Sequence, residues 1–240
     1  MSKRFLVFQH TSWEGPGKHL IKSALKNTIR LDIIKLWKQL IPSLASYDGL
    51  LVLGGTLNIN QEDQYPFLKE EKQAIKEWIA ADRPYLGICL GHQLLAEALG
   101  AKIDDNYCAS IGFIDGYLTH KGKSHPLFNK IPPRLPLFKW HSQAVMEPVP
   151  RNLSILATSA ECQIEAISIK ERPHIVGVQF DNNAADLNEV KKFLQKSSTW
   201  LASFTGKYIN PGTIIAEAAK HERAIEKQYD TIFSNFICLS

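Results

Sequence analysis

The chain has 240 residues, a formal net charge of +4 and 22% charged residues, which suits one globular α/β domain large enough to bury a core. Its 28 basic and 24 acidic residues are scattered, and no basic run is interleaved with aromatic residues, so we expect no nucleic-acid partner. No apolar run approaches the roughly 18 residues that a membrane-spanning helix needs, so no membrane association is expected.

The cysteines lie far apart and form no C-x-x-C pair, which favours neither a zinc site nor a disulfide framework. They are Cys89, Cys108, Cys162 and Cys238. The apolar stretch behind Lys3-Arg4 ends after four residues, at Phe8, and is too short for the core of a signal peptide. We therefore expect a cytoplasmic protein with no metal and no cofactor.

In the first half of the chain, short apolar runs alternate with helical patterns. Strands are predicted over residues 4–9, 31–36, 50–53 and 85–88, and helices over 19–26, 67–81 and 93–99. This alternation predicts a parallel sheet covered by helices on both faces. Sites on such sheets lie at the carboxyl ends of the strands, where Gly54-Gly55 and Cys89 both fall.

From Ala109 the pattern changes to short strand-like runs, and the prolines around residues 132–133 and 148–150 exclude long helices. Strands are predicted over residues 111–119, 137–140, 154–157, 164–169 and 175–180, and helices over 184–202 and 211–236. We expect the strands to complete the sheet. The predicted organisation is a domain of residues 1–204 with a C-terminal helical extension, residues 205–240, packed on it.

Cys89 ends the predicted strand over residues 85–88, and a helix begins at once. A cysteine between the small residues Gly87 and Gly91 has the layout of a nucleophile elbow, which lifts the side chain to the edge of the sheet. The free N–H groups and the positive dipole end of the helix favour a thiolate and a nearby oxyanion. The alternative is a buried cysteine that only packs in the core.

Residues 87–93, Gly-Ile-Cys-Leu-Gly-His-Gln, resemble the class I glutamine amidotransferases, and most of all a stand-alone branch similar to the glutaminase domain of GMP synthase. Further segments match that branch in order along nearly the whole chain. Among them are Gln9-His10, Glu14-Gly15-Pro16-Gly17, Asp48-Gly49, Leu53-Gly54-Gly55, Trp140-His141-Ser142 and Gly177-Val178-Gln179-Phe180. The resemblance implies a flavodoxin-like three-layer α/β domain with a central, mostly parallel sheet, helices on both faces and a docked C-terminal helical segment.

The resemblance also implies a reaction. Cys89 would attack the side-chain amide of glutamine, release ammonia and form a glutamyl thioester that water hydrolyses. The oxyanion donors would be backbone N–H groups of Leu90 and of the Gly54-Gly55 turn. Substrate-binding positions would be Gln93, Ser142 and Gln143. The implied ligand is glutamine or a γ-glutamyl small molecule, and a synthetase or other protein partner would be a separate chain.

The chain departs from this family at the rest of the catalytic triad. Where the family has Gln-Phe-His-Pro-Glu, this chain has Gln-Phe-Asp-Asn-Asn, so Asp181 replaces the base and Asn183 the orienting carboxylate. An aspartate ionised at neutral pH, with an ordinary pKa of about 3.9, is a weak base and disfavours a nearby thiolate. Ser110 replaces another family glutamate. We predict that glutamine hydrolysis is impaired or absent and that the protein has a binding or regulatory role.

Other interpretations stay open. Asp181 can instead cap a helix that begins near Ala184, or bind a cationic or amide-bearing ligand. Cys89 can act in a glutamine amidotransferase or γ-glutamyl hydrolase with a non-standard base. His141 is a better candidate for that base than His92, which the helix carries away from the thiol. Cys89 can also be a redox or modification site.

Overall fold

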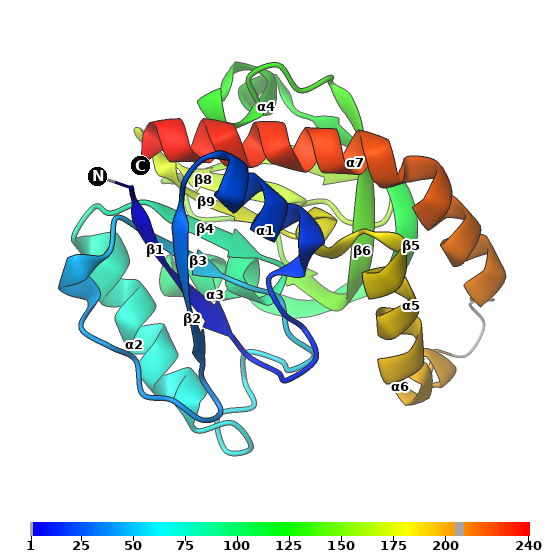
Figure 1. Cartoon of the computed structure of the whole chain (residues 1–240), viewed down its shortest axis with the longest axis horizontal. Coiled ribbons are helices and arrows are strands. Elements are labelled where there is room, and N and C mark those ends of the chain that lie inside the picture. The colour runs from blue at the N-terminus through cyan, green and yellow to red at the C-terminus, as the bar shows by residue number, and fades with distance from the viewer. Residues whose placement is uncertain (1, 205–208) are drawn as a thin grey trace.

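The computed structural model describes residues 2–204 and 209–240. Within them, nine strands form one sheet in the order β2-β1-β3-β4-β9-β8-β7-β5-β6 (Figure 1). The strands are β1 (Arg4–Gln9), β2 (Arg30–Lys35), β3 (Gly49–Val52), β4 (Tyr85–Ile88), β5 (Ile103–Leu118), β6 (Arg134–Val145), β7 (Leu153–Ser159), β8 (Ala166–Ile169) and β9 (Arg172–Val178). The pairs from β2 to β9 are parallel. The pairs from β9 to β6 are antiparallel, so the second half of the chain completes the sheet.

Helices cover both faces of this sheet, as the alternating pattern predicts (Figure 1). They are α1 (Gly17–Lys26), α2 (Phe67–Ala80), α3 (Leu90–Ala98), α4 (His120–Ser124), α5 (Leu187–Lys196), α6 (Ser198–Ala202) and α7 (Pro211–Leu239). Side chains of α1 and α7 share one hydrophobic cluster with one face of β1, and those of α2 and α3 share a second cluster with the other face. The predicted α/β fold, with the sheet between two helical layers, is confirmed.

Three predicted elements differ markedly from those in the structure. The strands predicted over residues 111–119 and 137–140 are the central parts of β5 and β6, which extend to 16 and 12 residues because they pair with each other along most of their length. The single helix predicted over residues 184–202 is wrong, since α5 begins only at Leu187 and ends at Lys196, and a second helix, α6, follows from Ser198. Asp186 caps α5 by accepting a hydrogen bond from the Asn188 N–H at 3.1 Å, whereas Asp181 makes no capping bond.

The C-terminal helix α7 packs on the sheet with α1. Phe233 and Phe236 are fully buried and contact the ring of Phe5 at centroid distances of 6.3 and 5.8 Å. The expected division between residues 204 and 205 adjoins residues 205–208, which lie outside the described residues, so that boundary stays a prediction. No helix in the described ranges is both long and apolar enough to cross a membrane.

A fully buried ion pair lies within the antiparallel part of the sheet, between β6 and the residue that precedes β8. Lys139 of β6 pairs with Glu165, and both side chains are 0% exposed. The same Glu165 oxygen accepts a hydrogen bond from Ser159 Oγ at 2.6 Å. Removing one partner of a buried pair leaves an uncompensated charge, whereas replacing both with neutral groups avoids that cost.

We expect Lys139→Met to lower the free energy of unfolding by about 3–5 kcal/mol, because Glu165 is then buried without its cation. The double variant Lys139→Met with Glu165→Gln should recover most of this loss, since the glutamine side chain keeps an acceptor for Ser159 and carries no charge. Urea unfolding of the wild type and the two variants measures the difference. A double variant as unstable as the single one would contradict this account.

Candidate functional site

Cys89 lies in a sharp turn between β4 and α3, with φ 49° and ψ −102°. A positive φ is uncommon for any residue with a Cβ atom and marks a strained backbone. The turn fits because its neighbours have no side chain. A Cβ atom on Gly91 would lie 2.1 Å from the Val52 carbonyl oxygen, and one on Gly87 would lie 2.3 Å from the Gly91 carbonyl oxygen. The local geometry is that of a nucleophile elbow.

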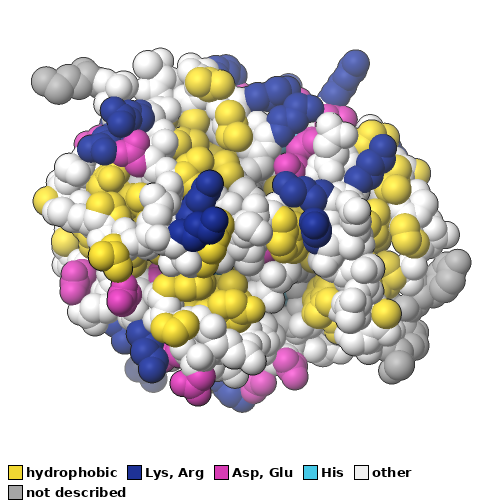
Figure 2. Space-filling model, turned by 60° about the horizontal axis from the view of Figure 1, so that its bottom comes forward, with side chains coloured by type: hydrophobic (Ala, Val, Ile, Leu, Met, Phe, Trp, Pro, Cys, Tyr) yellow, Lys and Arg dark blue, Asp and Glu magenta, His cyan; other side chains and the backbone are white. Residues whose placement is uncertain are grey.

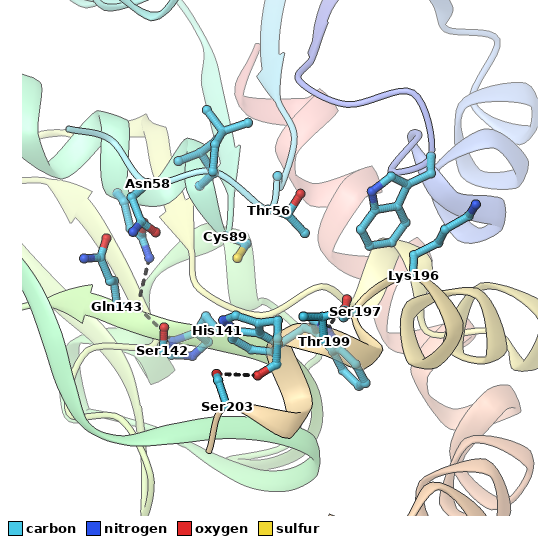
Figure 3. Close-up of a pocket in the computed structure, with 17 residues that line it drawn as sticks. Thr56, Asn58, Cys89, His141, Ser142, Gln143, Lys196, Ser197, Thr199 and Ser203 are labelled. Carbon is cyan, nitrogen blue, oxygen red and sulfur yellow. Dashed lines mark hydrogen bonds between the residues drawn. The ribbon is translucent and has the colours of Figure 1, made fainter. Parts of the chain in front are cut away.

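A cavity of about 490 Å³ opens over Cys89 (Figure 3). Among the predicted binding positions it brings together Gly55, Leu90, Gln93, Ser142 and Gln143 around the thiol. Nearby, a second cavity of about 10 Å³ is lined by Gly54, Asp181, Asn183 and Glu14, among other residues. The predicted site residues therefore fall into two groups: five line the large cavity with Cys89, and three surround a space of about one water molecule.

The side chain of His10 fixes the Gly54-Gly55 turn through a hydrogen bond to its backbone. One ring nitrogen, His10 Nδ1, donates to the Gly54 carbonyl oxygen at 3.0 Å, and Nε2 pairs with Glu71 Oε1 at 2.8 Å, both side chains being buried. Burial lowers the pKa of His10, but the Glu71 carboxylate and the other hydrogen bonds raise it by more, so the net pKa is above its ordinary value. Since a trans peptide points its N–H opposite to its C=O, the Gly55 N–H is directed away from His10.

Asp181 follows β9 and is fixed by its own N–H, which donates to the Phe138 carbonyl oxygen at 2.8 Å. Its carboxyl group lies against Gly54, where a Cβ atom would be 2.9 Å from Oδ1, and within hydrogen-bonding range of Cys89. Burial raises the pKa of Asp181 well above its usual range, and Glu14 raises it further. Burial therefore favours the protonated, neutral form of this carboxyl group, an effect that the sequence alone does not reveal.

Glu14 is a second buried acidic residue near the thiol. No local sequence pattern indicates that this side chain is buried. Its Oε2 accepts hydrogen bonds from Thr11 Oγ1 and the Thr56 N–H, both at 2.9 Å. Burial raises the pKa of Glu14 to about 7 despite these bonds. A glutamate in a loop with glycine and proline is typical of a solvated turn, and only the fold places it between the loop after β3 and the residues after β9.

The Cys89 thiol is buried among these groups. Burial raises its pKa well above the ordinary value, and negative charge on Asp181 or Glu14 raises it further. Lys139 and the Leu90 N–H act in the opposite direction with smaller effect. Gln179 Nε2 lies 3.6 Å from Sγ as a weak donor. At neutral pH the group is a thiol, which is the poor nucleophile.

The two histidines considered as bases lie in different places. His92 packs inside α3 against Gly177, where a Cβ atom would come within 2.6 Å of His92 Nδ1, and it does not line the cavity. Burial lowers the pKa of His92 to about 3, so it is neutral. His141 lies in the wall of the cavity, and its Nδ1 donates to the Gln143 carbonyl oxygen at 2.8 Å.

The asparagines after Asp181 have structural contacts. Asn182 accepts a hydrogen bond from the Phe138 N–H at 2.7 Å and donates to the Pro136 carbonyl oxygen at 3.0 Å, which ties this loop to β6. Asn183 donates to the Pro16 carbonyl oxygen at 3.1 Å, and its own Oδ1 has no hydrogen-bond partner among the described residues. Ser110 Oγ donates to a Glu161 carboxylate oxygen at 2.9 Å.

A family model for class-I glutamine amidotransferases matches residues 17–181 of this chain, a stretch that contains the elbow and ends at Asp181. The chain belongs to the class-I glutamine amidotransferase family. It is 32% identical over 159 residues to one subunit of the glutamine-hydrolyzing GMP synthase of Methanocaldococcus jannaschii, covering 63% of this chain and 74% of that one. It is 28% identical to the putative glutamine amidotransferase-like protein YfeJ of Salmonella typhimurium, over 86% of this chain and 85% of that one.

Solved structures agree with this membership. A glutamine amidotransferase from Thermotoga maritima superposes with a TM-score of 0.86 at 25% identity, covering 99% of both chains. A glutamine amidotransferase from Methylobacillus flagellatus has a TM-score of 0.85 at 21% identity over 100% of this chain and 96% of that one, which supports the fold. Both matches include α7, so the whole architecture is shared with these proteins.

Glu14 is expected to make the fold less stable as pH rises. Its pKa is about 7 in the folded protein against 4.5 for an exposed glutamate, so between these values the folded state binds more protons than the unfolded state. Glu14→Gln keeps the oxygen acceptor and removes the titration. Urea unfolding should show the variant gaining about 3 kcal/mol relative to wild type between pH 4.5 and pH 7. The exposed Glu70→Gln is the control, and a gain independent of pH would contradict this assignment.

Cys89 should resist alkylation at neutral pH. Because burial raises its pKa, we expect the iodoacetamide rate, followed by mass spectrometry of the Cys89 peptide, to keep rising beyond about pH 9. The exposed Cys238 serves as an internal control for the reagent. A labelling midpoint below about pH 7 would mean an activated thiolate and would contradict a buried, protonated thiol.

Proposed function

We propose that this protein is a glutamine amidotransferase-like binding or regulatory protein in which glutamine hydrolysis is strongly impaired. The observation that carries the proposal is the buried Asp181 carboxyl group that lies against the Cys89 thiol, at the position where the family resemblance puts the histidine base. We propose that Cys89 keeps the nucleophile position, that Asp181 and Asn183 occupy the other two triad positions, and that the intact pocket binds glutamine or a γ-glutamyl small molecule.

Hydrolysis of an amide by a thiol requires two proton movements. The proton on Sγ must leave, and the departing amine must gain a proton. A protonated Asp181 cannot accept the first proton, while an ionised Asp181 opposes thiolate formation by its charge. Residual catalysis of about 10³–10⁴-fold over water is typical when triad members are removed from a protease. Such a rate is measurable but small for a metabolic supply of ammonia.

The residues of the cavity next to Cys89 support the proposal that the protein still binds a ligand there. Gln93 Nε2 donates to the Gln143 carbonyl oxygen at 2.9 Å and to Gln179 Oε1 at 3.3 Å, so the floor of the cavity is held in place. The N–H of Gly55, directed away from His10, is available to a carbonyl oxygen of the ligand. We propose Gly54, Gly55, Leu90, Gln93, Ser142 and Gln143 as the ligand-binding set.

The small cavity between the replaced triad positions supports the same interpretation. Aspartate and asparagine are smaller than the histidine and glutamate that the resemblance implies there, and a space of about 10 Å³ remains beside them. One buried Oδ atom of Asp181 and one of Asn183 have no partner among the described residues, as expected of a site that has lost its hydrogen-bond network. A buried polar atom without a hydrogen-bond partner lowers the stability of the fold, and its presence here argues against a complete, hydrogen-bonded catalytic triad.

The partner, location and organisation of the protein are also parts of this proposal. Because a similar protein is named as one subunit of GMP synthase, we propose a separate protein chain, either a synthetase or another regulated protein, as the partner. We propose a cytoplasmic protein with an amidotransferase domain over residues 1–204 and a helical extension over 205–240. No group of described residues is arranged to hold a metal ion.

A second candidate is a Cys-dependent glutamine amidotransferase or γ-glutamyl hydrolase with a non-standard base. The observation in its favour is His141, which lies in the same cavity wall as the ligand-binding set. A redox role for Cys89 is less well supported, because redox-sensing cysteines are accessible and have a low pKa, whereas Cys89 is buried with a raised pKa.

The double variant Asp181→His with Asn183→Glu should restore the missing base and its orienting group. We expect glutamine hydrolysis, measured as glutamate release, to rise by about 100-fold or more, the usual range of general acid–base catalysis. Adding Cys89→Ala should abolish the gain. The matched control is Asp181→Asn with Asn183→Gln, which changes both positions without supplying a base.

Two results would oppose this proposal. Robust glutamine hydrolysis by the wild type that is lost in Cys89→Ala would establish the second candidate. No gain in the double variant would mean that these two substitutions do not account for the impairment, and Ser110 would be the next position to restore.

A further inference from the structure

The cavity over Cys89 is larger than a glutamine molecule needs. Its volume of about 490 Å³ falls within the roughly 300–1,000 Å³ of sites for drug-sized ligands. Ser142 and Gln143, which would hold an amide, lie on one side of the thiol, and Lys196 lies on the other (Figure 3). The remaining volume extends toward the loop after β1 and toward α5 and α6. That part of the cavity lies beyond the residues that we propose to hold the amide.

One wall of this extension is aromatic. Trp13, Trp140 and Trp200 line the cavity; buried Phe193 connects Trp13 to Trp140, and Trp140 contacts Trp200. Phe193 contacts the rings of Trp13 and Trp140 at centroid distances of 5.2 and 5.4 Å, and Trp140 contacts Trp200 at 6.4 Å. Trp140 is fixed further by its Nε1–H, which donates to Ser197 Oγ at 3.1 Å. The rings are thus held in place before a ligand arrives, which reduces the ordering cost of binding.

These tryptophans come from distant parts of the chain. Trp13 follows β1, Trp140 is in β6 and Trp200 is in α6. In the sequence they show no periodic pattern, so the wall exists only in the folded protein. Trp13 and Trp200 are partly exposed, so their rings retain surface that a flat apolar group can cover. Aromatic pairs of this kind gain stability beyond the area they bury.

Lys196, at the end of α5, supplies the charge of this region. It lines the cavity, as Trp13 does, and its side chain stands at the rim (Figure 3). Among the described residues that line the cavity, Lys196 is the only one with a formal charge, and none is acidic. Within the described ranges, Lys196 makes no ion pair. On the face that is turned forward in Figure 2, hydrophobic side chains gather with Lys and Arg side chains among them, and Asp and Glu side chains lie mainly near its edge. An anionic ligand carrying an apolar group matches this chemistry.

We propose that the cavity has a second subsite, formed by the three tryptophans and Lys196, that binds an aromatic ring carrying a carboxylate. Together with the amide-binding groups near Cys89, the subsite fits a γ-glutamyl conjugate of an aromatic amino acid. The ring lies on the tryptophan wall, the free carboxylate of the aromatic amino acid pairs with Lys196, and the γ-glutamyl amide lies over Cys89. The γ-glutamyl end of this ligand rests on the proposed function, whereas the aromatic end does not.

Isothermal titration calorimetry with a matched ligand set tests the subsite on the full-length protein. γ-Glutamylphenylalanine carries both features, γ-glutamylalanine lacks the ring, and γ-glutamylphenethylamide lacks the carboxylate. We expect γ-glutamylphenylalanine to bind about tenfold or more tightly than γ-glutamylalanine and glutamine. Trp200→Leu, which keeps an apolar side chain, should remove most of the preference for the ring.

Lys196→Gln should weaken γ-glutamylphenylalanine about threefold, more at low salt than at high salt, and leave γ-glutamylphenethylamide unchanged. The matched control is Lys192→Gln on the same helix, because Lys192 pairs with Glu189 at 3.2 Å and does not line the cavity. Thermal unfolding checks that each variant is folded, and the Lys196 variant tests the subsite even if Trp200→Leu is unstable.

The outcomes separate this subsite from the proposed function. If γ-glutamylalanine and γ-glutamylphenylalanine bind equally, the subsite is overturned while the γ-glutamyl ligand stands. If no γ-glutamyl compound binds but N-acetylphenylalanine binds and depends on Trp200 and Lys196, the subsite stands while the γ-glutamyl part fails. If none of these compounds binds, both are overturned.

Discussion

The contact on which the rest of this structure depends is the close approach of the Cys89 turn to the neighbouring strands. The first turn of α3 lies so near β3 and β4 that neither Gly87 nor Gly91 has room for a Cβ atom. This approach holds Cys89 at a positive φ and starts α3 at the next residue. The thiol is then buried at the junction of β4, β9 and the loop after β3, where its surroundings, rather than its sequence neighbours, decide its chemistry.

Those surroundings are acidic and buried. Asp181 and Glu14 reach the thiol from different loops, and burial raises the pKa of both carboxyl groups and of Cys89. Burial in low-dielectric surroundings favours the neutral forms of the thiol and of the carboxyl groups. Lys139 is the cation that lowers the pKa of the thiol, but it is paired with Glu165 and does not offset the effect of burial. The family's fold is therefore retained around a site in which burial favours the neutral forms of the thiol and of the two carboxyl groups.

Much of the architecture could be predicted from the sequence. Buried parallel strands are short continuous apolar runs, so β1, β3 and β4 were located within a residue or two of their ends, and the glycines around Cys89 marked the elbow. The long strands β5 and β6 were underestimated because their outer parts are polar and are held by pairing with each other. The start of α5 was misplaced because several Asp and Asn residues precede it, and only the backbone geometry shows that Asp186 is the cap.

The sequence by itself determined the α/β class and the elbow with its cysteine, since both are properties of local pattern, and the family resemblance implied that Asp181 and Asn183 stand at the other two triad positions. The tertiary structure decided the raised pKa of Asp181, the burial of Glu14 beside it, and the aromatic wall with Lys196 at its rim. These depend on which side chains from distant segments are brought together and how far water is excluded from them. Burial and long-range proximity arise only when the chain folds, so no local pattern encodes them directly.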